Sequence, residues 1–358
     1  MRPARARIDL GAMRHNLQQA RKHAQGARVM AVIKANGYGH GILRAARGLA
    51  AADGFAVASL EEALQLREAG IDKKILLLEG FFEPDELDTI AARQLDLVIH
   101  QPQQLALLEQ TRLAAPVGVW LKINTGMNRL GVAPEQAVPF YQRLVDHPDV
   151  SSVTLMTHFA NADDRRDSYT RQQSARFYQC IDGLDAAVSC ANSAALLFAS
   201  GTLGQWVRPG IMLYGVSPFL ASTGRDEDLK PVMTLESELI AVRQQRAGDP
   251  VGYGGAWVCP EDMPVGVVAI GYGDGYPRHA KTGTPVLVRG QRASLIGRVS
   301  MDMLTLDLRN VIDAQIGDRV VLWGDGLAVE EVAGCSGTIA YELLCQVTDR
   351  VRFLVEQD

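Results

Sequence analysis

The sequence predicts an α/β fold in which an N-terminal (β/α)8 TIM-like barrel is followed by a mostly β domain. In the first two thirds of the chain, short apolar runs alternate with stretches of helical apolar spacing. Beyond about residue 228, short strands separated by Gly, Asp and Asn turns take over. The length of 358 residues also exceeds the roughly 100–200 residues of one domain. We therefore expect a barrel over residues 1–230 and a β domain over residues 231–358.

Eight apolar runs in the first part have the composition of buried parallel strands, and amphipathic segments separate most of them. The runs are residues 28–36, 54–59, 74–80, 95–100, 117–124, 152–159, 187–193 and 208–215. The helical segments include residues 60–70, 85–94, 134–147 and 168–184, with a short last one at 193–201. Eight strand–helix units favour a closed barrel. An open doubly wound sheet remains an alternative, because periodicity defines the units but not their closure.

The second part has the pattern of an antiparallel sheet with one helical interruption. Strands are expected within residues 231–245, 264–278, 284–308 and 316–326, and one helical piece over 329–347. The polar segment 217–231 ends at a proline and is typical of a linker between domains.

Composition and charge narrow the function classes. Thirty-six basic and 41 acidic side chains leave a formal charge of −5, which favours neither nucleic acid nor an anionic membrane as a partner. No apolar run approaches the roughly 20 residues of a membrane-spanning helix, and the basic first ten residues lead into no apolar signal segment. Five scattered cysteines and seven dispersed histidines lack metal-ligand or disulfide spacing. We expect a cytoplasmic protein without a metal site.

In a parallel barrel, functional side chains lie at the C-terminal ends of the strands. That rule selects a cation- and hydroxyl-rich set of candidates. They are Lys34, Asn36 and Tyr38 after the first run, Lys122, Asn124 and Arg129 after the fifth, His158 after the sixth, Asn192 and Ser193 after the seventh, and Arg208, Gly210, Ile211 and Tyr214 on the eighth.

Lys34 carries the sharpest signal in this set. A lysine at the end of an apolar strand is partly desolvated, which favours the neutral, nucleophilic amine. Such amines form Schiff bases with aldehydes, pyridoxal phosphate above all. On position alone an ordinary surface lysine is the simpler interpretation. The loop that follows, with Gly37, Gly39, Gly41 and the hydroxyl of Tyr38, favours an anion site instead.

Three further candidates have plain structural alternatives. His158 alone is typical of a packed, hydrogen-bonded histidine. Tyr253 and Tyr272 lie in glycine-flanked loops, where an aromatic residue usually packs on a turn. A tyrosine becomes a general base only where nearby cations favour its phenolate. No Walker motif or GxSxG nucleophile elbow is present.

The block AVIKANGYGHG resembles the cofactor-lysine motif of bacterial alanine racemases, which are pyridoxal phosphate enzymes. Blocks along nearly the whole chain resemble the family in the same order: LKINTGMNRLG, THFANADD, CANSAALL, VRPGIMLYG, VMTLESELI, VGYGGAW, GYGDGYPR, GRVSMDM and TIAYELLC. The resemblance implies a barrel with a C-terminal β domain and a head-to-tail homodimer whose active sites combine residues of both subunits.

The resemblance also implies roles for individual residues. Lys34 would hold the cofactor as an aldimine and act as one catalytic base, on the D-alanine face. Tyr253 of the partner subunit would be the opposite base, on the L-alanine face. The cofactor would be bound by Lys34, Tyr38, Arg129, His158, Asn192, Ser193, Arg208, Gly210, Ile211 and Tyr341.

Further implied roles concern the ring nitrogen and the substrate. Arg208 would face the pyridine nitrogen and leave it unprotonated, because a guanidinium does not readily give up its proton. Arg129 would contact the substrate carboxylate together with Met301 of the partner subunit, and Tyr272 would line the entrance. Lys122 matches a position that is often carbamylated, which would turn a cation into an anion that holds Arg129.

Departures from the family pattern and competing functions remain. Ser300 stands where cysteine is frequent, and VTDRVRFLVE lacks a common proline; neither change removes a catalytic candidate. A pyridoxal-dependent decarboxylase of the same fold would carry a different phosphate block and a cysteine–aspartate pair, which are missing. A non-catalytic pyridoxal-homeostasis protein is usually the barrel alone. A serine or broad-specificity racemase is the nearest competitor, although such relatives often carry an export signal. Whether D-alanine would be made for peptidoglycan or degraded stays open.

Overall fold

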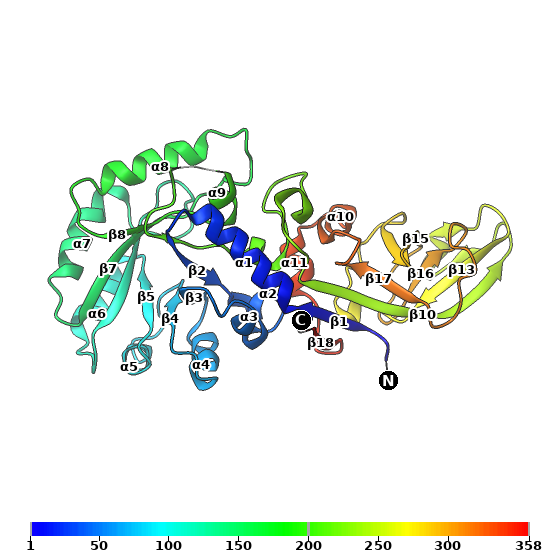
Figure 1. Cartoon of the computed structure of the whole chain (residues 1–358), viewed down its shortest axis with the longest axis horizontal. Coiled ribbons are helices and arrows are strands. Elements are labelled where there is room, and N and C mark those ends of the chain that lie inside the picture. The colour runs from blue at the N-terminus through cyan, green and yellow to red at the C-terminus, as the bar shows by residue number, and fades with distance from the viewer. Residues whose placement is uncertain (1, 199–200, 357–358) are drawn as a thin grey trace.

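The computed structural model describes residues 2–198 and 201–356, and it has two parts (Figure 1). One part is a barrel of parallel strands surrounded by helices. The other is a narrower arm built mainly of antiparallel strands, and the long strand β10 (Met233–Gln245) runs out along it. The predicted fold class is confirmed.

Eight parallel strands form the barrel in the order β8-β7-β6-β5-β4-β3-β2-β9. Their bounds are β2 Arg28–Val32, β3 Gly54–Val57, β4 Lys74–Leu77, β5 Asp96–Ile99, β6 Val117–Lys122, β7 Val150–Met156, β8 Ala187–Ser189 and β9 Trp206–Val207. Between β8 and β9 the ring closes through hydrogen bonds of both the backbone and side chains. The Ser189 hydroxyl donates to Trp206 O at 2.9 Å, and Arg208 N donates to Ala191 O at 2.9 Å. The sheet is therefore closed and not doubly wound.

Helices cover the outside of the barrel, as the spacing of apolar residues predicts. They are α1 Leu10–Ala24, α3 Ile42–Gly48, α4 Leu60–Glu68, α5 Glu86–Ala92, α6 Pro102–Gln110, α7 Ala137–Val145, α8 Tyr169–Cys180 and α9 Ser193–Phe198, with the 3₁₀ turn η1 Pro134–Gln136. Residues 199 and 200 of the predicted last helical segment lie outside the described residues. Asp9 caps α1 by accepting a hydrogen bond from Ala12 N at 2.8 Å.

The eighth predicted strand is displaced from its predicted position. The run 208–215 was expected to be a strand, but β9 comes before it and Ile211–Tyr214 form the 3₁₀ helix η2. Pro209 has no N–H to donate to a ladder, and Leu213 N donates to Gly210 O at 2.9 Å to close the helical turn. The strand accordingly stops where the proline begins.

Inward-facing side chains from nearly every barrel strand fill the interior. This inner core consists of Met30, Val32, Ala56, Leu76, Val98, Trp120, Met156 and Trp206. The barrel centre is consequently packed, and the strand ends at its mouth are left to carry polar groups.

The second sheet combines both ends of the chain in the order β13-β16-β15-β14-β17-β10-β1-β18. Its other strands are β1 Arg5–Asp9, β13 Met263–Val268, β14 Pro285–Val288, β15 Gln291–Ile296, β16 Leu304–Asp307, β17 Arg319–Trp323 and β18 Arg352–Glu356; a small hairpin adds β11 Pro250–Val251 and β12 Trp257–Val258. Short 3₁₀ turns are η3 Gly224–Glu227, η4 Tyr253–Gly255 and η5 Tyr272–Asp274. The N-terminal strand β1 thus belongs to this sheet, although the chain enters the barrel directly after it.

The helical piece predicted over residues 329–347 is two helices. These are α10 (Val329–Cys335) and α11 (Ala340–Cys345), and Gly337 interrupts them with a φ of 66°. The left-handed conformation suits glycine and turns the chain between the helices. Both helices lie at the junction of the two parts (Figure 1).

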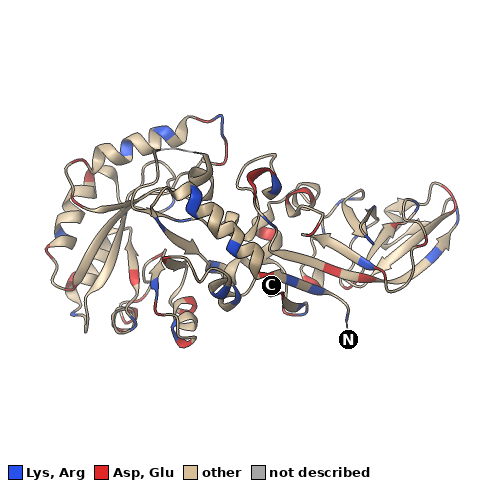
Figure 2. Cartoon of the chain, in the orientation of Figure 1, with Lys and Arg blue, Asp and Glu red and all other residues tan. Residues whose placement is uncertain are grey.

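A buried carboxylate joins β1 to its neighbours. Glu236 on β10 is only 2% exposed and forms ion pairs with Arg5 and Arg7 of β1 and with Arg319 of β17, at 2.5, 3.2 and 2.5 Å. Figure 2 shows the charged residues gathered along these strands. Burial raises the pKa of Glu236, but hydrogen bonds from Arg5 and Arg319 outweigh that effect and lower it overall.

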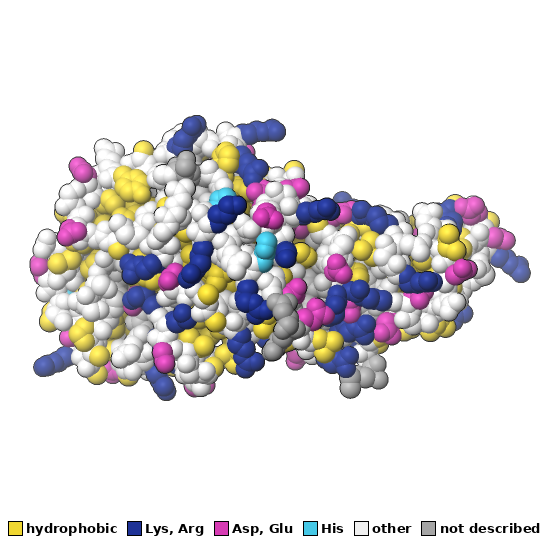
Figure 3. All heavy atoms as spheres, viewed as in Figure 1, with side chains coloured by type: hydrophobic (Ala, Val, Ile, Leu, Met, Phe, Trp, Pro, Cys, Tyr) yellow, Lys and Arg dark blue, Asp and Glu magenta, His cyan; other side chains and the backbone are white. Residues whose placement is uncertain are grey.

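Charge elsewhere on the surface is mixed. On the face drawn in Figure 3, basic and acidic side chains are interspersed over both parts. Among the helices of residues 2–198 and 201–356, none combines the length and the apolar character required to cross a lipid bilayer.

Replacing Glu236 with Gln is expected to lower the free energy of unfolding by about 2 kcal/mol at neutral pH, because arginines lose a charged acceptor. Since the folded-state pKa is depressed, the carboxylate's contribution is present above its unfolded pKa and is lost as pH falls through the folded value. Urea unfolding at several pH values measures this, with exposed Glu68→Gln as the control. An equal difference between wild type and E236Q at all pH values would contradict it.

Candidate active site at the barrel mouth

A cavity of about 1440 Å³ opens at the mouth of the barrel, between the strand ends and the helices α10 and α11. It collects most of the residues that the sequence singled out. Those that line it are Lys34, Tyr38, Lys122, Arg129, His158, Asn192, Ser193, Arg208, Gly210, Ile211 and Tyr341. Residues separated by more than 300 positions in the sequence thus share one cavity.

Lys34 lies directly after β2 and begins the short segment α2 (Lys34–Tyr38), whose backbone winds left-handed. Ala35, Asn36 and Tyr38 adopt φ values of 53°, 53° and 50°. For residues with a Cβ, this conformation costs roughly 1–2 kcal/mol each, whereas Gly37 adopts it freely. The tight turn lets both Lys34 and Tyr38 face the cavity.

Neighbouring elements hold this turn in place. Glu62 of α4 accepts a hydrogen bond from Asn36 N at 3.0 Å, and the Asn36 side chain accepts one from Ile42 N at 2.9 Å. On the opposite side, Gly39 lies so close to α11 that a Cβ would collide with the carbonyl oxygen of Leu344. The turn is consequently fixed against the barrel and against the second part of the chain.

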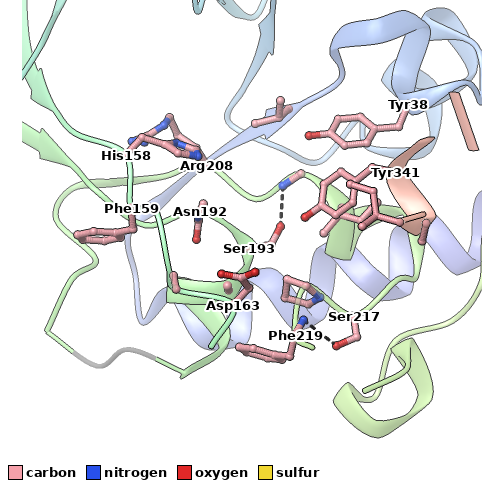
Figure 4. Close-up of a pocket in the computed structure, with 18 of the residues that line it drawn as sticks. Tyr38, His158, Phe159, Asp163, Asn192, Ser193, Arg208, Ser217, Phe219 and Tyr341 are labelled. Carbon is pink, nitrogen blue, oxygen red and sulfur yellow. Dashed lines mark hydrogen bonds between the residues drawn. The ribbon is translucent and has the colours of Figure 1, made fainter. Parts of the chain in front are cut away.

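Three hydroxyls gather at one end of the cavity. The Ser193 hydroxyl accepts hydrogen bonds from Gly210 N at 2.9 Å and Met212 N at 3.4 Å. Figure 4 shows the Tyr38 and Tyr341 hydroxyls pointing toward the side of the cavity where Ser193 lies. A Cβ at Gly210 would collide with the Tyr38 hydroxyl. Burial raises the pKa of both tyrosines, so both hydroxyls stay protonated and can donate to an anion.

Arg208 lies at the other end of the cavity beside His158 (Figure 4). It is 3% exposed, and its Nη1 and Nη2 atoms donate to Ser189 O and Thr157 O at 2.8 and 2.6 Å. The same two atoms also donate to Ser189 Oγ and Cys190 O, and every side-chain hydrogen bond of Arg208 to the described residues leaves from one of them. Its Nε–H is therefore the donor available to a ligand. Burial lowers its pKa to about 10, which still leaves it protonated at neutral pH.

Buried positive charge changes the titration of two neighbours. Burial, together with the charges of Arg208, Arg129 and Lys34, lowers the pKa of Lys122 to about 8. Burial and the same cations hold the pKa of His158 well below its usual value, so this imidazole is neutral. The cavity therefore contains a lysine that is partly neutral under physiological conditions and a histidine that adds no further charge.

Three predicted site residues do not reach this cavity within one chain. Tyr253 lies in η4 of the arm and is 71% exposed, and Tyr272 in η5 and the nearby Met301 are also exposed. Glycines on both sides of Tyr253 adopt positive φ, which turns the loop outward. Any contribution of these side chains to the cavity has to come from a second copy of the chain.

Some lining residues were missed by the sequence analysis. Glu79 follows β4, and its negative charge partly compensates the cations around Lys122. Its position at the end of a strand could have identified it as a site residue. The predicted linker carries Ser217 and Phe219, which are buried and form one wall of the cavity. The Asn192 Oδ1 accepts a hydrogen bond from Ala195 N at 3.0 Å, so this side chain also caps the start of α9.

Comparison with known proteins shows to which family this chain belongs. Models of the N-terminal and C-terminal domains of alanine racemase match residues 8–218 and 232–355. An alanine racemase of Shewanella loihica is 52% identical over 353 residues, covering 98% of this chain and 99% of the relative. The chain belongs to the alanine racemase family. The resemblance found in the sequence is thereby confirmed.

Solved structures of the family agree with the fold. The crystal structure of biosynthetic alanine racemase from Pseudomonas aeruginosa has a TM-score of 0.97 at 46% identity and covers 100% of both chains. The alanine racemase of Acinetobacter baumannii has a TM-score of 0.94 at 37% identity, covering 99% of this chain and 100% of that one.

Replacing Arg208 with Lys is expected to lower the free energy of unfolding by about 3 kcal/mol, because one ammonium cannot satisfy the carbonyls of both Ser189 and Thr157. Urea unfolding measures the change, with exposed Arg171→Lys as the matched control. If R208K and R171K unfold at the same urea concentration, the structural role assigned to the guanidinium is wrong.

Proposed function

We propose that this protein interconverts L-alanine and D-alanine with pyridoxal phosphate as cofactor and with active sites shared between two copies of the chain. One observation carries the proposal. A lysine amine at a strand end faces a cavity that has a hydroxyl cradle at one end and a buried arginine at the other. Membership of the alanine racemase family supports the same reaction.

The donor set of the cavity fits the cofactor. The hydroxyls of Tyr38, Ser193 and Tyr341 suit a phosphate, since protonated hydroxyls donate to its oxygens. Tyr38 lies so close to Gly210 that a Cβ at position 210 would collide with the Tyr38 hydroxyl of this cradle. Asn192 and Ile211 also belong to the proposed binding set, and Arg129 would contact the cofactor's phenolic oxygen. When bound, pyridoxal phosphate withdraws electrons from the substrate's α-carbon and makes its hydrogen acidic.

The protein's own groups then have to move one proton on each face of that carbon. Lys34 would hold the cofactor aldehyde in the resting enzyme; once the substrate amine has replaced it there, its freed Nζ would accept or return the α-proton on the D-alanine face. Tyr253 from a second copy would act on the L-alanine face. Arg208 would offer its Nε–H to the ring nitrogen and leave that nitrogen unprotonated, because guanidinium does not readily release a proton. His158 lies beside Arg208 and is proposed to link it to Tyr253.

The positions of the exposed tyrosine loops support active sites that are shared between two chains. Tyr253, Tyr272 and Met301 lie on the arm, away from the cavity of their own chain. In a head-to-tail homodimer each arm would cover the other chain's barrel mouth. Met301 and Arg129 would then bind the substrate carboxylate, and Tyr272 would line the entrance.

We also propose that Lys122 is carbamylated. Only a neutral amine attacks CO2, and the lowered pKa of about 8 makes this form accessible. The amine nitrogen bonds to the carbon of CO2 and releases one proton, which leaves a carbamate anion. That anion would pair with Arg129 and would replace the repulsion between two cations by an attraction.

The cellular setting is a further part of the proposal. Five cysteines without a disulfide among them are consistent with a reducing, cytoplasmic compartment. The product D-alanine would serve peptidoglycan synthesis, or the reverse reaction would degrade it. Comparing L- and D-isomers of alanine, serine and larger amino acids by polarimetry separates an alanine racemase from a broad-specificity one.

Borohydride reduction of the holoenzyme is expected to fix the cofactor on Lys34, because this amine faces the cradle. Peptide mass mapping locates the label, and the Lys34→Ala variant should bind pyridoxal phosphate without becoming labelled. A label on Lys122 or on a surface lysine would refute the assignment.

Substitution of Tyr253 by Phe is expected to slow α-hydrogen exchange of L-alanine by about 100-fold or more, since it removes a general base. Exchange of D-alanine should fall far less, because Lys34 is unchanged. Proton exchange in deuterated water, followed by NMR for each isomer, measures both rates, with Tyr141→Phe on the barrel's outer face as the control. Equal losses for the two isomers would contradict the two-base scheme.

Carbamylation of Lys122 predicts that ¹³C-labelled bicarbonate gives a carbamate NMR signal that is missing in Lys122→Gln. The signal should grow as pH rises through about 8, where the amine loses its proton. A wild-type spectrum identical to that of K122Q would remove this part of the proposal.

A further inference from the structure

We propose that His40 is a positioning residue that holds the left-handed turn after Lys34, and thereby orients Lys34 and Tyr38 toward the cavity. The role in holding the turn stands on the geometry alone. The consequence for cofactor binding and racemisation rests on the function proposed above.

His40 lies beneath the turn and is 0% exposed. Its Nδ1 is 3.0 Å from Gly37 O and 2.9 Å from Tyr38 O. Both partners are carbonyl oxygens, which only accept hydrogen bonds, so Nδ1 has to carry the hydrogen. A single N–H therefore holds two successive carbonyls of the turn, and Tyr38 is one of the residues strained by a positive φ.

The other ring nitrogen of His40 contributes no such contact. Nε2 is buried and has no hydrogen-bond partner within the described residues. The residue is thus used through Nδ1 and through the face of its ring. A histidine is therefore needed here for its Nδ1–H donor, since Nε2 makes no polar contact.

The ring of His40 also ties the turn to the strand that precedes it. It packs on Tyr214 with ring centroids 4.7 Å apart, and Tyr214 stacks on Tyr38 at 4.7 Å. The Tyr214 hydroxyl donates to Val32 O at 3.1 Å, at the end of β2. His40, Tyr214 and Tyr38 therefore connect both sides of Lys34 in one buried group.

The His40 imidazole stays neutral across the physiological pH range. Burial, aided by the charge of Arg44, lowers its pKa to about 4 despite the two carbonyls that favour its protonated form. The imidazole is consequently a fixed neutral donor and has no part in proton transfer to substrate.

Two substitutions separate the donor from the packing. His40→Asn places an amide N–H near the position of Nδ1 but removes the ring, whereas His40→Phe keeps a ring against Tyr214 and removes the donor. If holding the turn is the role, H40N should resemble wild type and H40F should not. If packing alone matters, the order reverses.

The first readout is amide hydrogen exchange in the purified holoenzyme, measured on peptides that cover residues 34–41. Four amides of the turn are hydrogen-bonded within it: Gly37 N to Ile33 O, Gly39 N to Ala35 O, His40 N to Gly37 O and Gly41 N to Asn36 O. We expect these to exchange about tenfold faster in H40F, as for loss of one buried hydrogen bond, and within about threefold of wild type in H40N.

The second readout is the dissociation constant of pyridoxal phosphate, followed by its absorbance, together with kcat and KM for L-alanine. We expect about tenfold weaker cofactor binding in H40F, with KM for alanine changed less than kcat, because the turn orients Lys34. If H40F does not fold, His40→Gln takes its place as the variant without a donor at Nδ1, because the longer side chain puts its amide near the position of Nε2.

The outcomes are separable. Equal exchange in the turn for wild type, H40N and H40F overturns the proposal, and so does faster exchange in H40N than in H40F. If wild type fails to interconvert alanine isomers, the proposed function fails, while the exchange comparison still decides whether His40 holds the turn.

Discussion

The barrel mouth brings four cations together, two of them buried, and this constraint governs the rest of the site. Lys34, Lys122, Arg129 and Arg208 line one cavity together with the carboxylates of Glu79, Asp163, Glu330 and Glu331, and Lys122 and Arg208 are buried. Cations brought together in a low-dielectric cavity repel one another by several kcal/mol unless some become neutral or an anion joins them. Burial is the larger cause of the lowered pKa of Lys122 and of the neutral state of His158, and repulsion from the neighbouring cations adds to it. An anionic cofactor with a carboxylate-bearing substrate is the ligand class that relieves the remainder.

Strand geometry produces this concentration. Parallel strands all end at the same edge, so residues from β2, β6, β7 and β9 meet although they are far apart in sequence. The left-handed turn after β2 then reverses the chain within a few residues, which keeps Lys34 and Tyr38 on the same cavity. Its strain is offset by hydrogen bonds to the carboxylate of Glu62 on α4 and from the side chain of His40.

The junction between the barrel and the arm is as important as the barrel itself. Tyr341 reaches the cradle only because α11 is held against Gly39 of the turn. The chain enters the barrel through β1, whose arginines pair with Glu236 in the arm's sheet. The two parts are therefore tied at both the N-terminal strand and the cofactor cradle. The exposed loop of Tyr253, in contrast, does not line the cavity of its own chain, so its proposed role depends on a second chain.

Periodicity and strand-end logic predicted the barrel, the arm and most of the residues that line the cavity. These predictions succeed because buried parallel strands have to be apolar and their ends have to converge. Sequence patterns did not predict the features that tertiary contacts determine. Pro209 shifted the eighth strand, and the polar segment with Ser217 and Phe219 became a cavity wall because it packs against α10. The left-handed conformation of Ala35 has no local signature, since alanine disfavours it, although asparagine at position 36 tolerates it.

The charged cavity is proposed to bind a phosphate-bearing aldehyde through its phosphate. Equilibrium dialysis of the cofactor-depleted protein against pyridoxine phosphate and against pyridoxine compares two ligands that share the ring and differ only in the phosphate; pyridoxal is unsuitable because it closes to a cyclic hemiacetal when the phosphate is missing. We expect pyridoxine phosphate to bind at least about 100-fold more tightly, because a buried, charge-assisted set of hydrogen bonds is lost with pyridoxine. Equal dissociation constants for the two compounds would contradict it.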